Sequence, residues 1–253
     1  MTNLKNFDKI FVLVSGGIDS TYLYDKLKKF YKEKVYPVNC FNPFEQSKTL
    51  DQISKDPNFI QIKPEAGLNY GQILKESFLK LPEAYKLKKE SRYYKKIFPC
   101  CAIIKHAAFL KDPLFQTPNT VVISGIKQGD GWRRRKFLEQ LAFGSKLISQ
   151  SITPNNYYFK LEGKERPTFF HLHKQGQLYA YPFRDYKYRN FPKIVLNRLY
   201  KKYPCLEHSA CSICPVVVLY NIYDSKNYKS SIKYAEQLGV VKTLFNYDKK
   251  IKR

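Results

Sequence analysis

The sequence predicts an α/β protein built on an open, mostly parallel twisted sheet with helices on both faces. Short apolar runs that suit buried strands alternate with segments of helical periodicity, which is the pattern of βαβ units. The first apolar run also leads directly into a glycine turn and then a helix. A chain of 253 residues, 43% of them hydrophobic, is long enough to bury such a core beside a smaller C-terminal subdomain that carries cysteines.

Four segments are predicted as strands of this sheet. Residues 9–14 (KIFVLV) are apolar almost throughout, as expected of a strand buried on both faces. The other three segments are also short and rich in apolar residues: 35–40, 59–62 and 120–124. Alternation of these strands with helices predicts that they run in parallel.

Helices are predicted where apolar side chains recur at helical spacing. One covers residues 19–30, and either Asp19 or Ser20 can cap its first turn. Residues 68–96 also begin with helical spacing, and they continue into the basic run KLKKESRYYKK. Residues 153–185, rich in Tyr, Phe and turn residues, instead predict a hairpin.

Net charge is the most unusual bulk property. The chain has 45 Lys and Arg against 21 Asp and Glu, which gives a formal charge of +24. An anionic partner is expected, with nucleic acid (tRNA or DNA) first, although a generally lysine-rich surface is the alternative. No apolar run approaches the roughly 18 residues of a membrane span. Because the N-terminus also lacks a signal pattern, we expect a cytoplasmic protein.

The segment Ser15-Gly16-Gly17-Ile18-Asp19-Ser20-Thr21 has the context of a phosphate-binding loop, between a predicted strand and a predicted helix. Glycines let backbone N–H groups turn toward phosphate oxygens, and the helix N-terminus adds partial positive charge. The hydroxyls of Ser15, Ser20 and Thr21 can donate further hydrogen bonds, and Asp19 can hold a Mg²⁺ that bridges the phosphates. A tight turn followed by helix caps is the structural alternative, and neither a Walker A motif nor a dinucleotide fingerprint fits.

The string SGGIDS resembles the signature of the PP-loop ATP pyrophosphatases, the adenine nucleotide α-hydrolase superfamily. Three further segments are similar to its PAPS and APS (phosphoadenosine and adenosine phosphosulfate) reductase branch. Residues 100–105 resemble CC-x-x-[RK]-[RK], residues 125–134 resemble G-x-R-x-x-Q-S-x-x-R, and residues 181–214 resemble YP-x-x-DW followed by C-x-x-C. The organisation of the chain predicts a domain boundary near residue 150, with a PP-loop nucleotide-binding domain over 1–150 and a C-terminal subdomain over 151–253 that carries the C-x-x-C and basic helices.

This resemblance implies binding of ATP or a sulfonucleotide, with cleavage of ATP between the α- and β-phosphates. Gly125 follows a predicted strand, at the edge where α/β sheets bind ligands, and the cations after it can contact phosphate or sulfate. Catalysis is expected from Asp19, Lys127 and Arg134. The residues expected to bind the nucleotide are Ser15, Gly16, Gly17, Asp19, Ser20, Thr21, Cys40, Gly125, Lys127 and Arg133, although Cys40 is most simply a core residue.

Six cysteines in a chain of this kind favour metal or redox use over a disulfide framework. In APS reductases an adjacent cysteine pair and a C-x-x-C hold a [4Fe–4S] cluster, and four positions here match: Cys100, Cys101, Cys211 and Cys214. We expect a cluster on these four residues, with zinc or no metal as alternatives. Cys205 lies outside the family pattern and is a possible substitute ligand.

Two departures from the reductases direct the functional prediction. No cysteine follows Cys214, so their C-terminal nucleophile is missing, and Asp19 suits ATP with Mg²⁺. The preferred expectation is an AMP-forming sulfurtransferase that adenylates an acceptor, with nucleic acid as the expected acceptor and a protein as a possible sulfur or electron donor. The alternatives are a sulfonucleotide reductase that releases sulfite, and a non-catalytic nucleotide- or nucleic-acid-binding module with a structural cluster.

Overall fold

The structure is a computed structural model. It describes residues 4, 7–45, 47–89, 98–101, 103–104, 108, 112–126, 158–161, 164–167, 169–172, 178–183, 193–203, 211–220 and 227–241. The chain forms two compact units from interleaved segments. Unit 1 comprises Met1–Asn39, Ser47–Gln61 and Asp112–His208, and unit 2 comprises Cys40–Gln46, Ile62–Lys111 and Ser209–Arg253. The domain boundary predicted near residue 150 lies outside the described residues.

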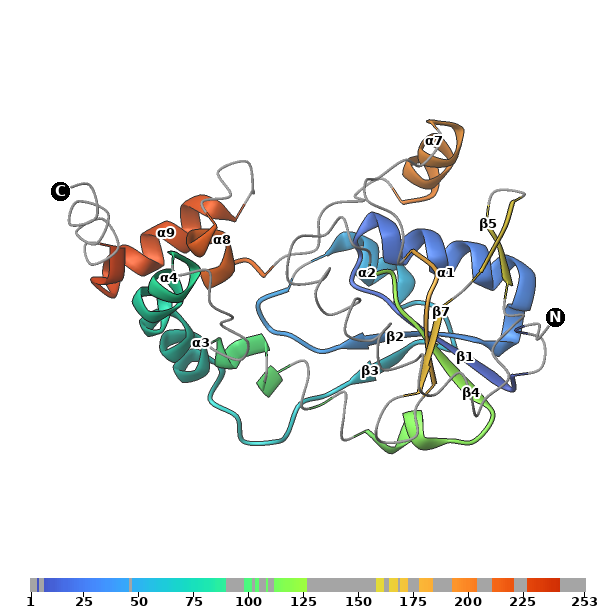
Figure 1. Cartoon of the computed structure of the whole chain (residues 1–253), viewed down its shortest axis with the longest axis horizontal. Coiled ribbons are helices and arrows are strands. Elements are labelled where there is room, and N and C mark those ends of the chain that lie inside the picture. Colours follow the sequence, from blue (N-terminus) through green and yellow to red (C-terminus); the bar gives the residue numbers. More distant parts are fainter. Residues whose placement is uncertain are drawn as a thin grey trace. The chain divides into compact units, whose positions relative to one another are not determined.

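The sheet of unit 1 has the strand order β3-β2-β1-β4-β8-β7 (Figure 1). Its first five strands run in parallel, and β7 pairs antiparallel with β8 at the edge. The predicted α/β class with a mostly parallel open sheet is therefore confirmed. The strands are β1 (Lys9–Leu13), β2 (Val35–Cys40), β3 (Ile60–Ile62), β4 (Thr120–Ile123), β7 (Phe169–Leu172) and β8 (Leu178–Tyr181).

A separate two-stranded sheet confirms the predicted hairpin. Strands β5 (Tyr158–Leu161) and β6 (Lys164–Pro167) pair antiparallel, with Leu161 opposite Lys164. The hairpin is thus distinct from the pairing of β7 with β8, which extends the main sheet. The interval 153–185 supplies both pairs of strands.

Helix α1 (Ile18–Tyr31) lies over one face of the sheet (Figure 1). Alternate residues of β1, Ile10 and Val12, belong to the same core as Leu23 and Leu27 of α1. The predicted side-chain cap is wrong, because Gly17 is the N-cap residue and no side chain caps it. Other helical elements in the described part of unit 1 are η2 (Lys32–Lys34), α2 (Lys48–Ile53), η4 (Pro113–Gln116) and α7 (Lys193–Lys202).

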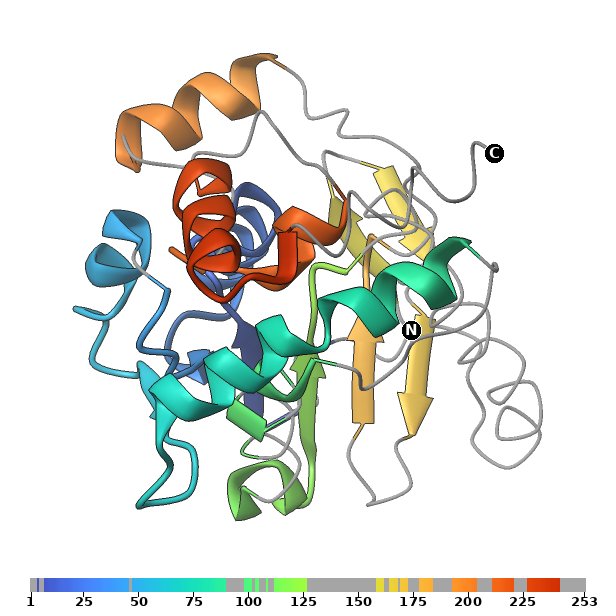
Figure 2. The same cartoon turned by 90° about the vertical axis from the view of Figure 1, so that its left-hand side faces the viewer.

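Unit 2 has a helical core of its own. It contains α3 (Tyr70–Leu79), α4 (Leu81–Lys89), α8 (Pro215–Leu219) and α9 (Tyr228–Gln237), which Figures 1 and 2 show together. Phe78 of α3 is fully buried, and its ring meets that of Tyr234 of α9 edge to face, with centroids 4.9 Å apart. Within the described ranges, no helix combines the length and the apolar character needed to cross a membrane.

In unit 1, the carboxylate of Asp56 ties α1 to the turn that follows α2. Tyr24 Oη donates to it at 2.5 Å, Lys28 Nζ pairs with it at 2.9 Å and the Asn58 backbone N–H donates at 2.8 Å. The Asp56 side chain is only 6% exposed. Burial opposes its charged form, but the hydrogen bonds from Lys28 and Tyr24 outweigh burial and hold the pKa of Asp56 below its usual value of 3.8.

A folded-state pKa below the unfolded one means that Asp56 stabilises the fold above the unfolded pKa, and that this stability is lost as pH falls through the folded pKa. We expect Asp56→Asn to lower the free energy of unfolding by about 1.5–3 kcal/mol at neutral pH, because charged hydrogen bonds are lost. The difference in free energy of unfolding between wild type and Asp56→Asn should stay constant from about pH 7 to about pH 5 and become smaller below about pH 4.

Urea unfolding across this pH range measures this difference. Glu83→Gln is the control, because its pair with Lys80 is more than half exposed and contributes little. A gap between wild type and Asp56→Asn that is unchanged in acid would contradict the assignment.

Candidate functional site

The predicted phosphate loop lies at the switch point of the sheet. From β1 the chain passes to β2 and β3 on one side, then returns to β4 on the other side of β1. Because β1 and β4 are parallel, their carboxyl ends meet at one edge, where residues 14–17 and residues 124–126 emerge. Open α/β sheets bind ligands in the crevice at this reversal of strand order.

Gly16 turns the chain at the centre of this loop. Its φ is +74°, a conformation that L side chains rarely adopt, and a Cβ built here would lie 2.0 Å from Ser47 Oγ. Ser47 is held in place because its hydroxyl caps α2 by accepting the Leu50 N–H at 3.2 Å. The structure therefore strongly favours glycine at this position, and any other residue would be strained and would have to displace Ser47.

Two side chains brace the loop from within unit 1. The Ser20 hydroxyl accepts the Ser15 N–H at 3.2 Å and donates to the Gly17 carbonyl at 3.1 Å. The buried Asn39 side chain donates to the Val14 carbonyl at 2.8 Å, where β1 passes into the loop. A loop held in this way is organised before any ligand arrives, which lowers the entropic cost of binding.

Asp19 and Thr21, on either side of Ser20, differ in exposure. Asp19 is half-buried in the first turn of α1, where a carboxylate also interacts favourably with the helix dipole. Thr21 is fully buried, and its hydroxyl has no hydrogen-bond partner among the residues that the structure describes. Asp19 is thus the more accessible of the two to a ligand.

Gly125 brings the end of β4 against α1. A Cβ built at Gly125 would lie 3.4 Å from both the Asp19 carbonyl carbon and the Ser20 amide nitrogen. The sequence places Gly125 at the sheet edge where ligands are expected, and the structure shows that its backbone packs closely against the first turn of α1. The loop and the end of β4 are therefore neighbours, whereas Lys127, Arg133 and Arg134 lie outside the described residues.

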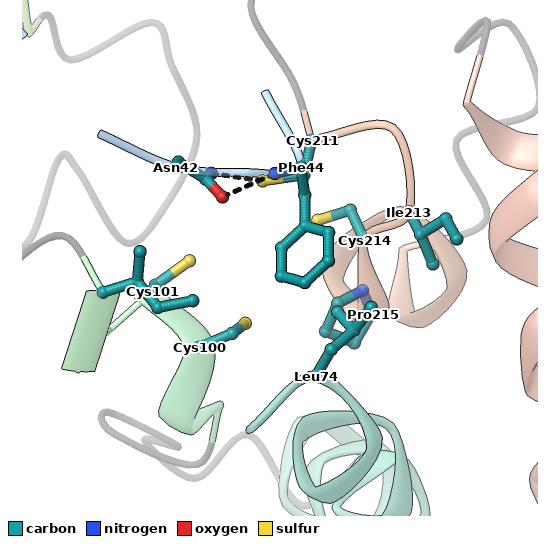
Figure 3. A pocket seen from close by; sticks show the side chains of 10 residues that line it. Asn42, Phe44, Leu74, Cys100, Cys101, Cys211, Ile213, Cys214 and Pro215 are labelled. Atoms are coloured by element: carbon teal, nitrogen blue, oxygen red, sulfur yellow. Dashed lines mark hydrogen bonds between the residues drawn. The ribbon is translucent and has the colours of Figure 1, made fainter. Parts of the chain in front are cut away.

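The four cysteines expected to bind metal line one pocket of unit 2 (Figure 3). Cys100 and Cys101 approach it from one side, and Cys211 and Cys214, which precede α8, approach from the other. Apolar side chains, including Phe44 and Ile104, complete the lining. Of the other two cysteines, Cys40 ends β2 and is not among the lining residues, and Cys205 lies outside the described part of the chain.

The pocket thiols influence one another. The hydrogen bond with Cys101 holds the pKa of Cys100 below its usual value, despite burial and the nearby Cys211 and Cys214. Burial raises the pKa of Cys214 to about 12, and Cys211 and Cys101 add to that rise. The four sulfurs thus behave as one interacting group.

A set of four thiols suits a soft, thiophilic metal or an iron–sulfur cluster in number and in kind. Among the described residues, no group of three or more His, Cys, Asp or Glu side chains is arranged so that it could hold a metal ion.

Two serines that the sequence analysis missed hold the cysteine backbones. Ser77 Oγ accepts the Cys100 N–H at 2.9 Å, and Ser231 Oγ accepts the Cys214 N–H at 3.0 Å. Each hydroxyl donates in turn to a carbonyl four residues earlier in its own helix segment, at 2.8 and 2.7 Å. In the sequence each serine is marked only by its position on the apolar face of a helix, and this position does not identify a distant partner.

No protein-family model matches the sequence, and a search of curated proteins finds no significant match. The class of the protein therefore rests on the fold itself. It is an α/β protein whose sheet is compatible with a nucleotide-binding superfamily.

Proposed function

We propose that this chain is a PP-loop enzyme that binds ATP at residues 15–20 and cleaves it between the α- and β-phosphates. The observation that carries the proposal is the position of the loop. A turn that strongly favours glycine at Gly16 lies at the switch point between β1 and β4, braced by Ser20 and directly followed by α1. Backbone N–H groups at a helix N-terminus favour the phosphates of a nucleotide.

The reaction needs a nucleophile, a leaving group and charge neutralisation. An oxygen of the acceptor attacks the α-phosphorus, the bond to the β-phosphate breaks, and pyrophosphate leaves with the charge that develops on it. Asp19, accessible in the first turn of α1, would hold the Mg²⁺ that neutralises this charge. Lys127 and Arg134 follow the end of β4 in sequence and are proposed to contact the transferred phosphoryl group.

The cysteine pocket supports the proposal of a sulfur-transfer reaction. Cys100, Cys101, Cys211 and Cys214 would hold a [4Fe–4S] cluster. With a cysteine on each of its four irons, such a cluster would supply electron transfer. A sulfur nucleophile from a separate donor would displace AMP from the adenylated acceptor, breaking the acceptor's bond to the oxygen that AMP carries away and forming a carbon–sulfur or phosphorus–sulfur bond.

Charge supports nucleic acid as the acceptor. A formal charge of +24 favours association with a phosphate backbone through release of counterions. Binding of this kind weakens steeply as salt rises, so the choice of salt concentration matters in any assay.

The test is ATP turnover by the full chain, purified without oxygen, with Mg²⁺, with tRNA or DNA as acceptor and with sulfide as the sulfur source. AMP and pyrophosphate should appear in equal amounts, and Asp19→Ala should lower the rate by about 100-fold or more, because charge on the leaving group is no longer neutralised. Asp51→Ala is a matched control, since Asp51 is exposed in the first turn of α2. Absence of AMP and pyrophosphate, or equal rates for wild type and Asp19→Ala, would contradict the proposal, and sulfite release from APS or PAPS would favour a reductase.

A further inference from the structure

Asn42 donates a hydrogen bond to a pocket cysteine from a part of the sequence with no recognised motif. Its Nδ2 lies 3.1 Å from Cys211 Sγ, and its Oδ1 accepts the Phe44 backbone N–H at 3.1 Å (Figure 3). The second bond fixes which end of the amide is the donor, because only the oxygen can accept an N–H. Asn42 is 8% exposed, so this orientation is enforced in a site largely shielded from water.

The backbone around Cys211 is held independently of this bond. Ser212 N–H donates to the Phe44 carbonyl at 2.5 Å, and Asn227 Nδ2 donates to the Cys211 carbonyl at 2.6 Å. Glu45 and Cys211 also form an antiparallel bridge. Since these contacts fix the main chain, the Asn42 amide acts on the Cys211 sulfur itself.

A neutral N–H donor stabilises the charge of a metal-bound thiolate without adding charge to the site. Residues that hydrogen-bond a metal ligand orient it and tune the metal, and their loss typically weakens metal binding about 10- to 100-fold. Hydrogen bonds to cysteine sulfur also set the reduction potentials of iron–sulfur clusters. Apart from Asn42 and the four cysteines, the residues that line the pocket are apolar, so the Asn42 amide is a polar donor in an otherwise apolar surrounding of the thiols.

We propose that Asn42 is a positioning residue for metal binding in the cysteine pocket, which orients the Cys211 sulfur and withdraws electron density from it. This inference rests on the metal-binding part of the proposed function. It adds a residue that neither the cysteine motifs nor the phosphate loop identifies.

The probe is Co²⁺, because cobalt bound to thiolates shows a charge-transfer band and its binding requires no cluster assembly. The metal-free full chain is titrated anaerobically as wild type, Asn42→Leu and Asn42→Asp. We expect Asn42→Leu to bind Co²⁺ about 10- to 100-fold more weakly. Its charge-transfer band should move to longer wavelength, because a sulfur without a hydrogen-bond donor is more easily oxidised. Asn42→Asp keeps the size and the Phe44 bond but presents a carboxylate oxygen to the sulfur, and it should bind at least as weakly.

Asn69→Leu is the matched control. Asn69 is an exposed residue of the same unit that caps α3 by accepting the Gln72 N–H, so its loss affects stability without touching a sulfur. Thermal unfolding of each variant separates loss of folding from loss of binding. If Asn42→Leu does not fold, Asn42→Asp tests the same bond.

Equal Co²⁺ affinity and an unshifted band in the Asn42 variants would overturn the inference, and so would a wild-type chain that gives no thiolate–cobalt band. Turnover of ATP reports separately on the phosphate loop in unit 1. Failure of the Asn42 inference and failure of the proposed nucleotide chemistry are therefore distinguishable.

Discussion

Gly16→Ala is expected to weaken ATP binding strongly, and with it the formation of pyrophosphate, while the sheet still folds. Gly16 has φ +74°, and an added Cβ would collide with Ser47 Oγ at 2.0 Å and with Ser47 Cβ at 2.8 Å. The backbone strain alone is about 1–3 kcal/mol. If the loop is displaced to relieve it, nucleotide binding weakens roughly 5- to 150-fold, and the collision with Ser47 adds to this loss.

The control for this variant is Gly67→Ala. Gly67 also has a positive φ, +81°, but a Cβ added there has no atom within 4 Å. It should cause comparable backbone strain and leave ATP binding unchanged. Isothermal titration with ATP and Mg²⁺ measures both variants. Equal ATP affinity for wild type and Gly16→Ala would show that the loop does not bind the nucleotide.

Cys211→Ser is expected to remove the metal from the protein. The change keeps the side-chain size but replaces the sulfur of a proposed metal ligand, which is also the acceptor of the Asn42 hydrogen bond. Soft metals and iron–sulfur clusters depend on thiolate ligands, so iron and acid-labile sulfide should fall to background after anaerobic purification.

Cys40→Ser is the matched control, because Cys40 is a half-buried cysteine at the end of β2 that does not line the pocket. It should retain the iron content and absorption spectrum of the wild type. Loss of iron in Cys40→Ser together with retention in Cys211→Ser would show that the cluster lies elsewhere.

Strands buried on both faces were the most predictable part of the fold. Residues 9–14 and 120–124 are apolar except at their ends, and β1 and β4 occupy nearly those ranges. Periodicity also predicted α1 to within a residue at each end. The helix cap could not be predicted in this way, because the Ser20 hydroxyl binds back to the loop instead of capping the helix.

The grouping of chain segments into units was less accessible to sequence reasoning. Residues 40–46 and 62–111 join residues 209–253 in unit 2, although most of unit 1 lies between them in the chain. Periodicity and composition report on neighbours in sequence, whereas this grouping depends on packing between distant helices. The core that contains Phe78, Leu219 and Ala235 is the packing that joins these segments.

The candidate site was predictable where residue type alone indicates chemistry. Thiols in two motifs indicated a shared pocket, and Cys100, Cys101, Cys211 and Cys214 do line one pocket. The supporting residues Ser47, Ser77, Asn42 and Ser231 carry common side chains, and their roles come from tertiary contacts. Such contacts leave no pattern in a single sequence.

A crystal structure of the full chain with Mg²⁺ and α,β-methylene ATP, which resists cleavage at the proposed bond, tests the central claim most directly. The account predicts phosphate oxygens on backbone N–H groups of residues 15–20, at the carboxyl ends of β1 and β4, with Mg²⁺ on the Asp19 carboxylate. A nucleotide bound away from this loop would contradict it.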